Sequence, residues 1–158
     1  MELSPKLIED YYKNKSVDAI CKEAGISRTT FQRLKKKQGL ANRRSFLSKI
    51  DTGDAELNMM LKTKYLSIVN RCNGMSTDKY GHYKDLDYMT LQEWVNLCNE
   101  NKPLLLDLWE RYVRLGRKLK HSVSIDRLDT AKGYTSANVQ FAPHGYNSWL
   151  RNLYPLKV

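Results

Sequence analysis

Apolar residues in the first forty positions recur at three- and four-residue spacing, in three short segments separated by polar residues. This spacing places apolar side chains on one face of a helix. A serine that can cap a helix precedes each segment, at Ser4, Ser16 and Ser27, and a proline follows the first of them, as is typical of a first helical turn. Gly25 and Gly39 follow the second and third segments, where glycine commonly ends a helix. We therefore expect three short helices.

The middle of the chain carries the same periodicity over longer stretches. We expect helices over about 56–73, from about 90, and over about 103–116. Thr90 and Glu93 form the capping box that opens the second of these. The inward faces, which we expect to be core rather than a functional stripe, carry Leu57, Met60, Leu61, Tyr65, Ile68, Cys72, Trp94, Val95, Cys98, Leu105, Trp109, Tyr112 and Val113.

Near the C-terminus the pattern changes to alternation. Val123 and Ile125 alternate with polar residues, as in a short half-buried strand, and 139–142 has the composition of a returning strand. Between them Gly133 marks a turn, because glycine reaches positive φ without steric cost. Pro143 suits the first turn of a helix, where its missing N–H is not needed. We expect a hairpin followed by a helix.

Length and composition fit a chain of two small domains. We divide it into residues 1–41, a basic linker over 42–56 and a second domain over 57–158, an α+β and mostly helical architecture. No apolar run approaches the ~20 residues that span a bilayer, and the N-terminus is no signal peptide, so we expect a cytoplasmic protein that contacts no membrane. The three cysteines are far apart and we expect them to be buried, not paired or zinc-binding.

The net charge of +10 points to a polyanionic partner. Its distribution is uneven. Residues 1–50 hold 12 Lys and Arg against 5 Asp and Glu, a net of +7, whereas residues 51–158 hold 15 against 12, a net of +3. The excess therefore lies in the first third, as expected for a separate basic module.

Two short helices joined through a glycine turn, the second one polar and basic, form a helix-turn-helix pattern. Residues 17–27 resemble helix-turn-helix domains of the resolvase and homeodomain-like kind. We expect the outward face of the third helix to contact double-stranded DNA, with arginine, glutamine and threonine able to read base edges and lysines suited to phosphates. A three-helix bundle with a solvated basic face is the alternative. The outward residues are Arg28, Thr29, Thr30, Gln32, Arg33, Lys35, Lys36 and Lys37.

The expected hairpin and helix bring three polar residues together. Asp126 lies on the first strand, Asn138 at the start of the second, and Asn147 about one turn into the helix. A carboxylate and an amide oxygen suit Mg²⁺, which keeps several waters and takes phosphate oxygens as further ligands. The sequence therefore predicts a site for Mg²⁺ or Mn²⁺.

Several short motifs occur in order near the C-terminus: Ser-Ile-Asp-Arg-Leu-Asp at 124–129, Lys-Gly-Tyr-Thr at 132–135, Asn-Val-Gln-Phe at 138–141 and the trailing Asn147. In these motifs the chain resembles an HNH endonuclease of the phage and homing type, with a ββα-metal finger. The resemblance covers the last third of the chain strongly and the middle third weakly. It implies that Asp126 and Asn147 are metal ligands and that Asn138 holds the loop and positions the general base.

Arg127 is a departure, because many relatives keep a histidine base there and this chain resembles a sub-group reading Asp-Arg-(Ile/Leu)-Asp. Arginine cannot accept a proton at neutral pH, but it can hold a phosphate or developing negative charge. The base is therefore unassigned. His144 is our first candidate, since it shares a helical face with Asn147; Asp129 and His121 are the others. Either histidine is equally well interpreted as an exposed polar residue with no role.

Further basic residues flank these motifs. We expect phosphate contacts from the linker, from the basic run before the first strand, and from the hairpin turn. A connector or surface loop would have a similar composition. The residues are Arg43, Arg44, Lys79, His82, Lys84, Lys118, Lys120 and Lys132, with Trp149, Arg151 and Asn152 in the C-terminal tail.

The function that we expect is hydrolysis of DNA phosphodiester bonds by a metal-dependent, phage-borne or homing-like endonuclease. The host cytoplasm is its expected location. The alternative is a non-catalytic DNA-binding regulator whose nuclease fold is degenerate. An RNA-binding or structural phage protein is a third possibility.

Overall fold

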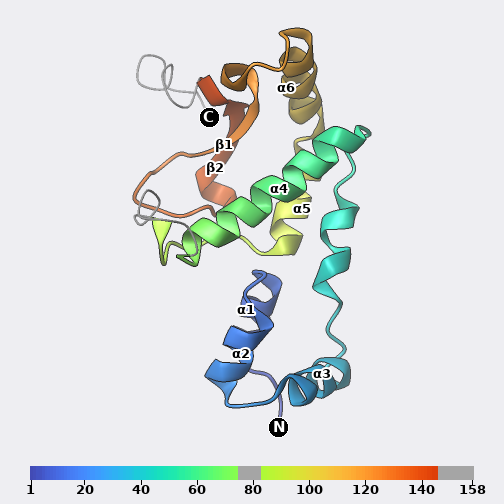
Figure 1. The fold of residues 1–158 in the computed structure, drawn as a ribbon, viewed down its shortest axis with the longest axis vertical. Helices are drawn as coiled ribbons and strands as arrows, with labels where there is room; N and C mark the ends of the chain where they lie inside the picture. Colours follow the sequence, from blue (N-terminus) through green and yellow to red (C-terminus); the bar gives the residue numbers. More distant parts are fainter. Residues whose placement is uncertain (75–82, 146–158) are drawn as a thin grey trace.

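Two separate apolar cores organise the protein, which is described from a computed structural model over residues 1–74 and 83–145 (Figure 1). The architecture is α+β and mostly helical, with one two-stranded sheet in the described residues. The elements in chain order are α1 (Pro5–Tyr12), α2 (Val17–Ala24), α3 (Arg28–Lys37), η1 (Arg43–Ser45), η2 (Leu47–Lys49), α4 (Ala55–Cys72), α5 (Leu91–Glu100), α6 (Lys102–Arg114), η4 (Leu119–His121), β1 (Val123–Arg127), η5 (Ser136–Asn138) and β2 (Val139–Pro143).

The first core is formed by α1, α2 and α3. Ser4, Ser16 and Ser27 cap the three helices as predicted, each accepting a hydrogen bond from a backbone N–H of the first turn. Gly25 ends α2 in the left-handed conformation. The buried residues of this core are Leu3, Tyr11, Ile20, Cys21, Phe31 and Leu34. The three-helix prediction is confirmed.

The second core lies among α4, α5, α6 and the β1–β2 hairpin. Asp54 caps α4, and Thr90 and Glu93 make the predicted capping box of α5. Phe46 and Ile50, which we placed in a linker, are buried in this core, so the connection between the two cores is packed against the second. The predicted inward residues of α4 and α5 are buried, except Met60, which is half-buried.

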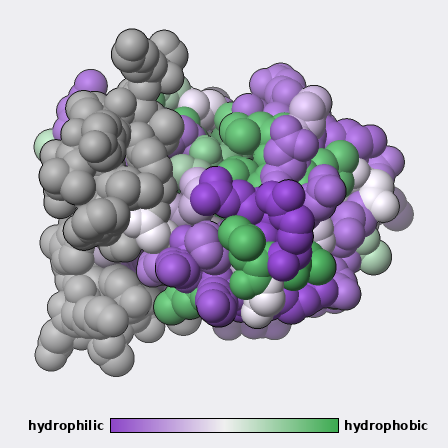
Figure 2. Space-filling view, turned by 90° about the horizontal axis from the view of Figure 1, so that it is seen from above, coloured by the Kyte–Doolittle hydropathy of each residue, from purple (hydrophilic) through white to green (hydrophobic). Residues whose placement is uncertain are grey.

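One predicted core position on α6 is wrong. Val113 is 41% exposed, because it lies one turn beyond Trp109, the last buried residue of this helix. Leu104 and Leu115 are exposed as well. Figure 2 looks onto the end of the molecule that carries α6 and the hairpin, where hydrophobic residues interrupt a mostly hydrophilic surface.

The hairpin is antiparallel, with Val123 opposite Pro143 and Asp126 opposite Gln140. Pro143 is thus the last residue of β2, not part of a helix as we predicted. A two-stranded sheet tolerates proline because each strand has an unpaired edge. Beyond the paired residues, the backbone N–H of His144, which is assigned to a helical turn, donates to the carbonyl of Ser122 at 2.8 Å.

Gly133 is required for a different reason from the one we gave. Its φ is not positive. Instead, a Cβ at this position would lie 1.7 Å from the carbonyl oxygen of Asp87. The close approach is part of an isolated bridge, in which the N–H of Tyr134 donates to Asp87 at 2.9 Å and the N–H of Met89 donates to Tyr134 at 3.0 Å.

The two cores are joined by polar contacts as well as by the chain. Tyr12 packs against both cores. The Tyr88 hydroxyl donates to the carbonyl of Lys13 at 2.9 Å, and the Lys13 ammonium forms an ion pair with Asp87. Arg43 donates to the Tyr11 carbonyl at 3.2 Å and also to that of Lys15. Figure 1 shows α1–α3 at one end, with α4 crossing between them and the hairpin.

Cys21, Cys72 and Cys98 are buried and form no disulfide, as predicted. Burial raises the pKa of the Cys98 thiol to about 12. Within the described ranges, none of the helices combines the length and the apolar composition needed to cross a membrane.

Candidate functional site

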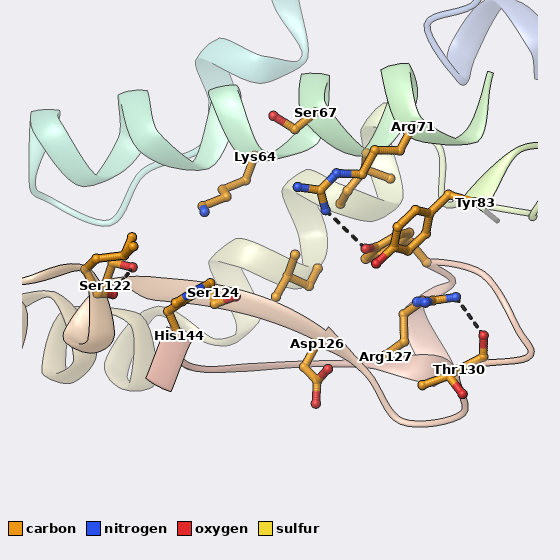
Figure 3. A pocket seen from close by; sticks show the side chains of 14 residues that line it. Lys64, Ser67, Arg71, Tyr83, Ser122, Ser124, Asp126, Arg127, Thr130 and His144 are labelled. Carbon is orange, nitrogen blue, oxygen red and sulfur yellow. Dashed lines mark hydrogen bonds between the residues drawn. The ribbon is translucent and has the colours of Figure 1, made fainter. Parts of the chain in front are cut away.

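A pocket of about 420 Å³ lies between α4 and the hairpin (Figure 3). Of the predicted site residues, its lining includes Asp126, Arg127 and His144 but not Asn138, and it adds residues that sequence reasoning missed. The lining is formed by Lys64, Ser67, Ile68, Arg71, Tyr83, Leu119, Ser122, Ser124, Ile125, Asp126, Arg127, Thr130, Tyr134 and His144.

Asp126 carries the one carboxylate among the described residues that line this pocket. It is 8% exposed, and Gln140, its partner across the hairpin, donates from Nε2 to Oδ2 at 3.4 Å. Side chains alternate between the faces of a strand, so Asp126 and Arg127 lie on opposite faces. In Figure 3 the carboxylate accordingly points away from α4.

Asn138 closes the loop that follows Asp126. Its Oδ1 accepts from the Asp129 N–H at 2.9 Å, and its Nδ2 donates to the carbonyls of Asp129 at 3.0 Å and Gly133 at 2.8 Å. Its carbonyl accepts from the Leu128 N–H at 2.7 Å. The loop-holding role that the resemblance implied agrees with these contacts.

Arg127 is a buried cation, 8% exposed. Its Nη1 donates to the carbonyls of Thr130 at 2.8 Å and Lys132 at 3.0 Å. The guanidinium also lies over the rings of Tyr83 and Tyr134, 4.6 and 5.4 Å from their centroids. These contacts tie Arg127 to the same loop that Asn138 closes.

Tyr83 and Tyr134 stack with their centroids 6.0 Å apart, and Arg71 approaches the pair from α4. Nη1 of Arg71 donates to the Tyr134 hydroxyl at 3.3 Å, and its guanidinium lies 5.7 Å from the Tyr83 centroid. Burial, and then the nearby Tyr83 hydroxyl, raise the pKa of Tyr134. This cluster holds Arg71 in a fixed orientation beside the pocket.

The α4 side of the pocket was not predicted. Lys64, Ser67 and Arg71 are spaced by three and four residues and therefore share a helical face. Burial lowers the pKa of Lys64, and the positive charge of Arg71 lowers it further. The spacing of these residues is visible in the sequence, but nothing in the sequence shows that this face of α4 borders the hairpin.

The three candidate bases differ in placement. His144 lines the pocket with Asp126, whereas neither Asp129 nor His121 is among the lining residues. Oδ1 of Asp129 accepts from the Ala131 N–H at 2.9 Å. Partial burial, followed by the charges of Lys120, Arg111 and Lys118, lowers the pKa of His121. His144 is the candidate best placed to act with Asp126.

The outward face of α3 is only partly available. Arg28 forms an ion pair with Asp18, the Thr30 hydroxyl accepts from that of Ser27 at 3.0 Å, and the Lys35 ammonium lies 5.3 Å from the Tyr11 centroid. Thr29, Gln32, Arg33, Lys36 and Lys37 are exposed.

The other predicted phosphate contacts are scattered. Arg43 is half-buried and donates to backbone carbonyls of the first module, whereas Arg44, Lys84, Lys118 and Lys120 are exposed. Lys132 is exposed and lies 3.9 Å from an oxygen of Asp129. Outside the described residues lie Lys79, His82, Asn147, Trp149, Arg151 and Asn152.

The residues present can be compared with the ligands that metal ions take. In the described ranges no three His, Cys, Asp or Glu residues gather as a metal site. Mg²⁺ is commonly held by one or two carboxylates together with waters and phosphate oxygens. Asp126, in a polar pocket rich in cations, suits that pattern.

No protein-family model, curated protein or solved structure matches the chain.

Proposed function

We propose that the protein is a metal-dependent endonuclease of the HNH type that hydrolyses phosphodiester bonds in double-stranded DNA. The observation that carries the proposal is the juxtaposition of Asp126 with a pocket that also contains Lys64 and Arg71. A carboxylate suits a divalent cation, and the cations suit the phosphates of a polyanion.

Asp126 and Asn147 would hold the metal ion. When bound, the ion neutralises charge on the phosphate and polarises it as a Lewis acid. Asn138 keeps the loop after Asp126 closed through its contacts with Asp129 and Gly133. We assign Arg127 a positioning role, because its guanidinium binds the carbonyls of that loop.

We assign His144 as the group that accepts the proton of the attacking water. His144 and Asp126 both line the pocket, and the backbone N–H of His144 donates to the carbonyl of Ser122, four residues before Asp126. At about 3.3 Å per residue, the Cα atoms of Ser122 and Asp126 lie roughly 13 Å apart along the strand. A phosphodiester group and a water fit within that separation.

DNA targeting is proposed for the first module, residues 1–41, with the nuclease proposed for residues 57–158. Thr29, Gln32 and Arg33, near the start and middle of α3, are exposed and can donate to base edges. Lys36 is exposed one turn after Gln32 and suits a phosphate.

A second candidate is a DNA-binding regulator without nuclease activity. It is favoured by one observation, the commitment of the Arg127 guanidinium to the carbonyls of its own loop. The residue next to Asp126 is then occupied away from a phosphate, and as an arginine it supplies no proton acceptor. The retention of Asp126 and Asn138 in well-formed surroundings favours the enzyme.

The test is incubation of the purified protein with supercoiled plasmid and Mg²⁺ or Mn²⁺, with EDTA as the control. The proposal expects nicked or linear products with either metal and none with EDTA. Intact plasmid under all conditions, combined with tight binding to the same DNA, would favour the regulator.

A further inference from the structure

The face of α4 that borders the pocket has the composition of an anion site. Lys64 supplies a compact charge, Ser67 a hydroxyl donor, and Arg71 a planar fork of donors. Lys64 and Arg71 project from α4 toward the hairpin (Figure 3). Phosphate oxygens are the acceptors that such a combination recognises in nucleic acids.

Two positive charges lie close together on this face and one of them is half-buried, which costs free energy that a bound anion would offset. Lys64 is half-buried, and no acidic side chain in the described ranges forms an ion pair with its ammonium. Burial lowers the pKa of Lys64, and the like charge of Arg71 lowers it further. Arg71 is held beside it by Tyr134 and Tyr83.

We propose that Lys64, Ser67 and Arg71 form a binding site for a DNA phosphodiester group on the α4 side of the pocket. The inference rests on the proposed function in that the same pocket receives the DNA. It adds that the strand is held from α4 as well as from the hairpin. The site needs no metal ion, because all its donors come from one helix.

The experiment measures binding of the full chain to a short duplex in EDTA, over a series of KCl concentrations. Each phosphate contact contributes roughly −0.9 to the slope of log K against log salt. Lys64→Gln is therefore expected to weaken binding and to reduce the slope by about 0.9. Lys62→Gln removes the same charge from the same helix outside the pocket lining, and it should leave the slope nearly unchanged.

Two further variants complete the test. Lys64→Arg should restore the slope, because it keeps the charge. Ser67→Glu places a carboxylate in the site and should weaken binding most at low salt. Thermal unfolding confirms that each variant is folded. Equal slopes for Lys64→Gln and Lys62→Gln, with Ser67→Glu binding like the parent, would overturn the inference.

The outcome is separable from that of the plasmid assay, because binding in EDTA requires no cleavage. A protein that never cuts DNA but shows the Lys64 effect keeps the phosphate site and rejects the nuclease. A protein that cuts DNA with no Lys64 effect keeps the nuclease and rejects the site on α4.

Discussion

The backbone at Gly133, in the hairpin loop, packs directly against the backbone of Asp87. A methyl group there would meet the backbone of Asp87, which cannot yield as a flexible side chain would. We predict that Gly133→Ala destabilises the protein by about 1–3 kcal/mol, the usual range for overpacking. Urea unfolding measures the change. Gly116→Ala is the contrasting variant, since nothing lies within 4 Å of its added Cβ and only its positive φ of 81° is strained. A Gly133→Ala protein as stable as the parent would contradict the close approach.

Substitution of Arg127 distinguishes a positioning role, in which the side chain holds its own loop, from direct contact with the phosphate. Arg127→Ala removes two hydrogen bonds from a charged donor, each worth about 1.5–3 kcal/mol in other proteins, and two ring contacts. We predict a loss of stability of about 3–6 kcal/mol, a lower cleavage rate and an unchanged shape of the pH–rate profile, because no group that titrates near neutral pH is removed.

The control for Arg127 is Arg111→Ala, an exposed arginine on α6. Unfolding in urea and cleavage over a pH series are measured for both variants. Should Arg127→Ala cleave slowly while keeping parental stability, a direct contact with the phosphate would replace the positioning role.

For single residues, the sequence predicts the contacts that form between neighbours along the chain. The serine caps and the capping box of Thr90 are local hydrogen bonds, and they were correct. The inward direction of Arg127 depends on strand register and on a loop that folds back beneath it. The reason for Gly133 depends on Asp87, which is distant in sequence. Neither could be read from local pattern.

At the scale of elements, the junction between α1 and the segment before α5 is held by the ion pair of Lys13 with Asp87. The hydrogen bond from Lys13 holds the pKa of Asp87 below its ordinary value. The stabilisation is therefore present above the ordinary pKa of the carboxyl and is lost as pH falls through the lowered one.

We predict that Asp87→Asn lowers stability by about 0.2–1 kcal/mol at neutral pH, the range for exposed pairs, since the Asp87 side chain is 66% exposed. The difference between the variant and the parent should shrink as pH falls from the ordinary pKa of the carboxyl through the lowered one. Thermal midpoints over a pH series measure this, with Asp85→Asn as the matched control. A constant difference between variant and parent down to low pH would contradict the ion pair as its cause.

The element boundaries also show where sequence reasoning fails. The helices were predicted closely because their periodicity and caps agree. The linker was not, because Phe46 and Ile50 are isolated apolar residues whose burial depends on the second core. The pocket was missed for a related reason, since it exists only where α4 docks against the hairpin.

At the scale of the whole molecule, the basic excess of the first third lies on a module with its own core. We predict that the double substitution Arg33→Gln with Lys36→Gln reduces the salt slope of DNA binding by about 1–2, at roughly 0.9 for each phosphate contact. Both residues are exposed on α3, so stability should change little. The control is Lys22→Gln, which removes an exposed lysine of α2. An unchanged slope in the double variant would remove α3 from the DNA-binding surface.

The central claim is that Asp126 is the metal-holding carboxylate of a nuclease. Asp126→Asn keeps the shape of the side chain and an oxygen for the Gln140 hydrogen bond, but it removes the charge. The most direct measurement is the rate of plasmid cleavage in Mg²⁺ by this variant, beside duplex binding in EDTA. We expect a loss in rate on the order of 100-fold or more with unchanged binding, because an amide is a poorer ligand for a hard cation. Cleavage by Asp126→Asn at the parental rate would contradict it.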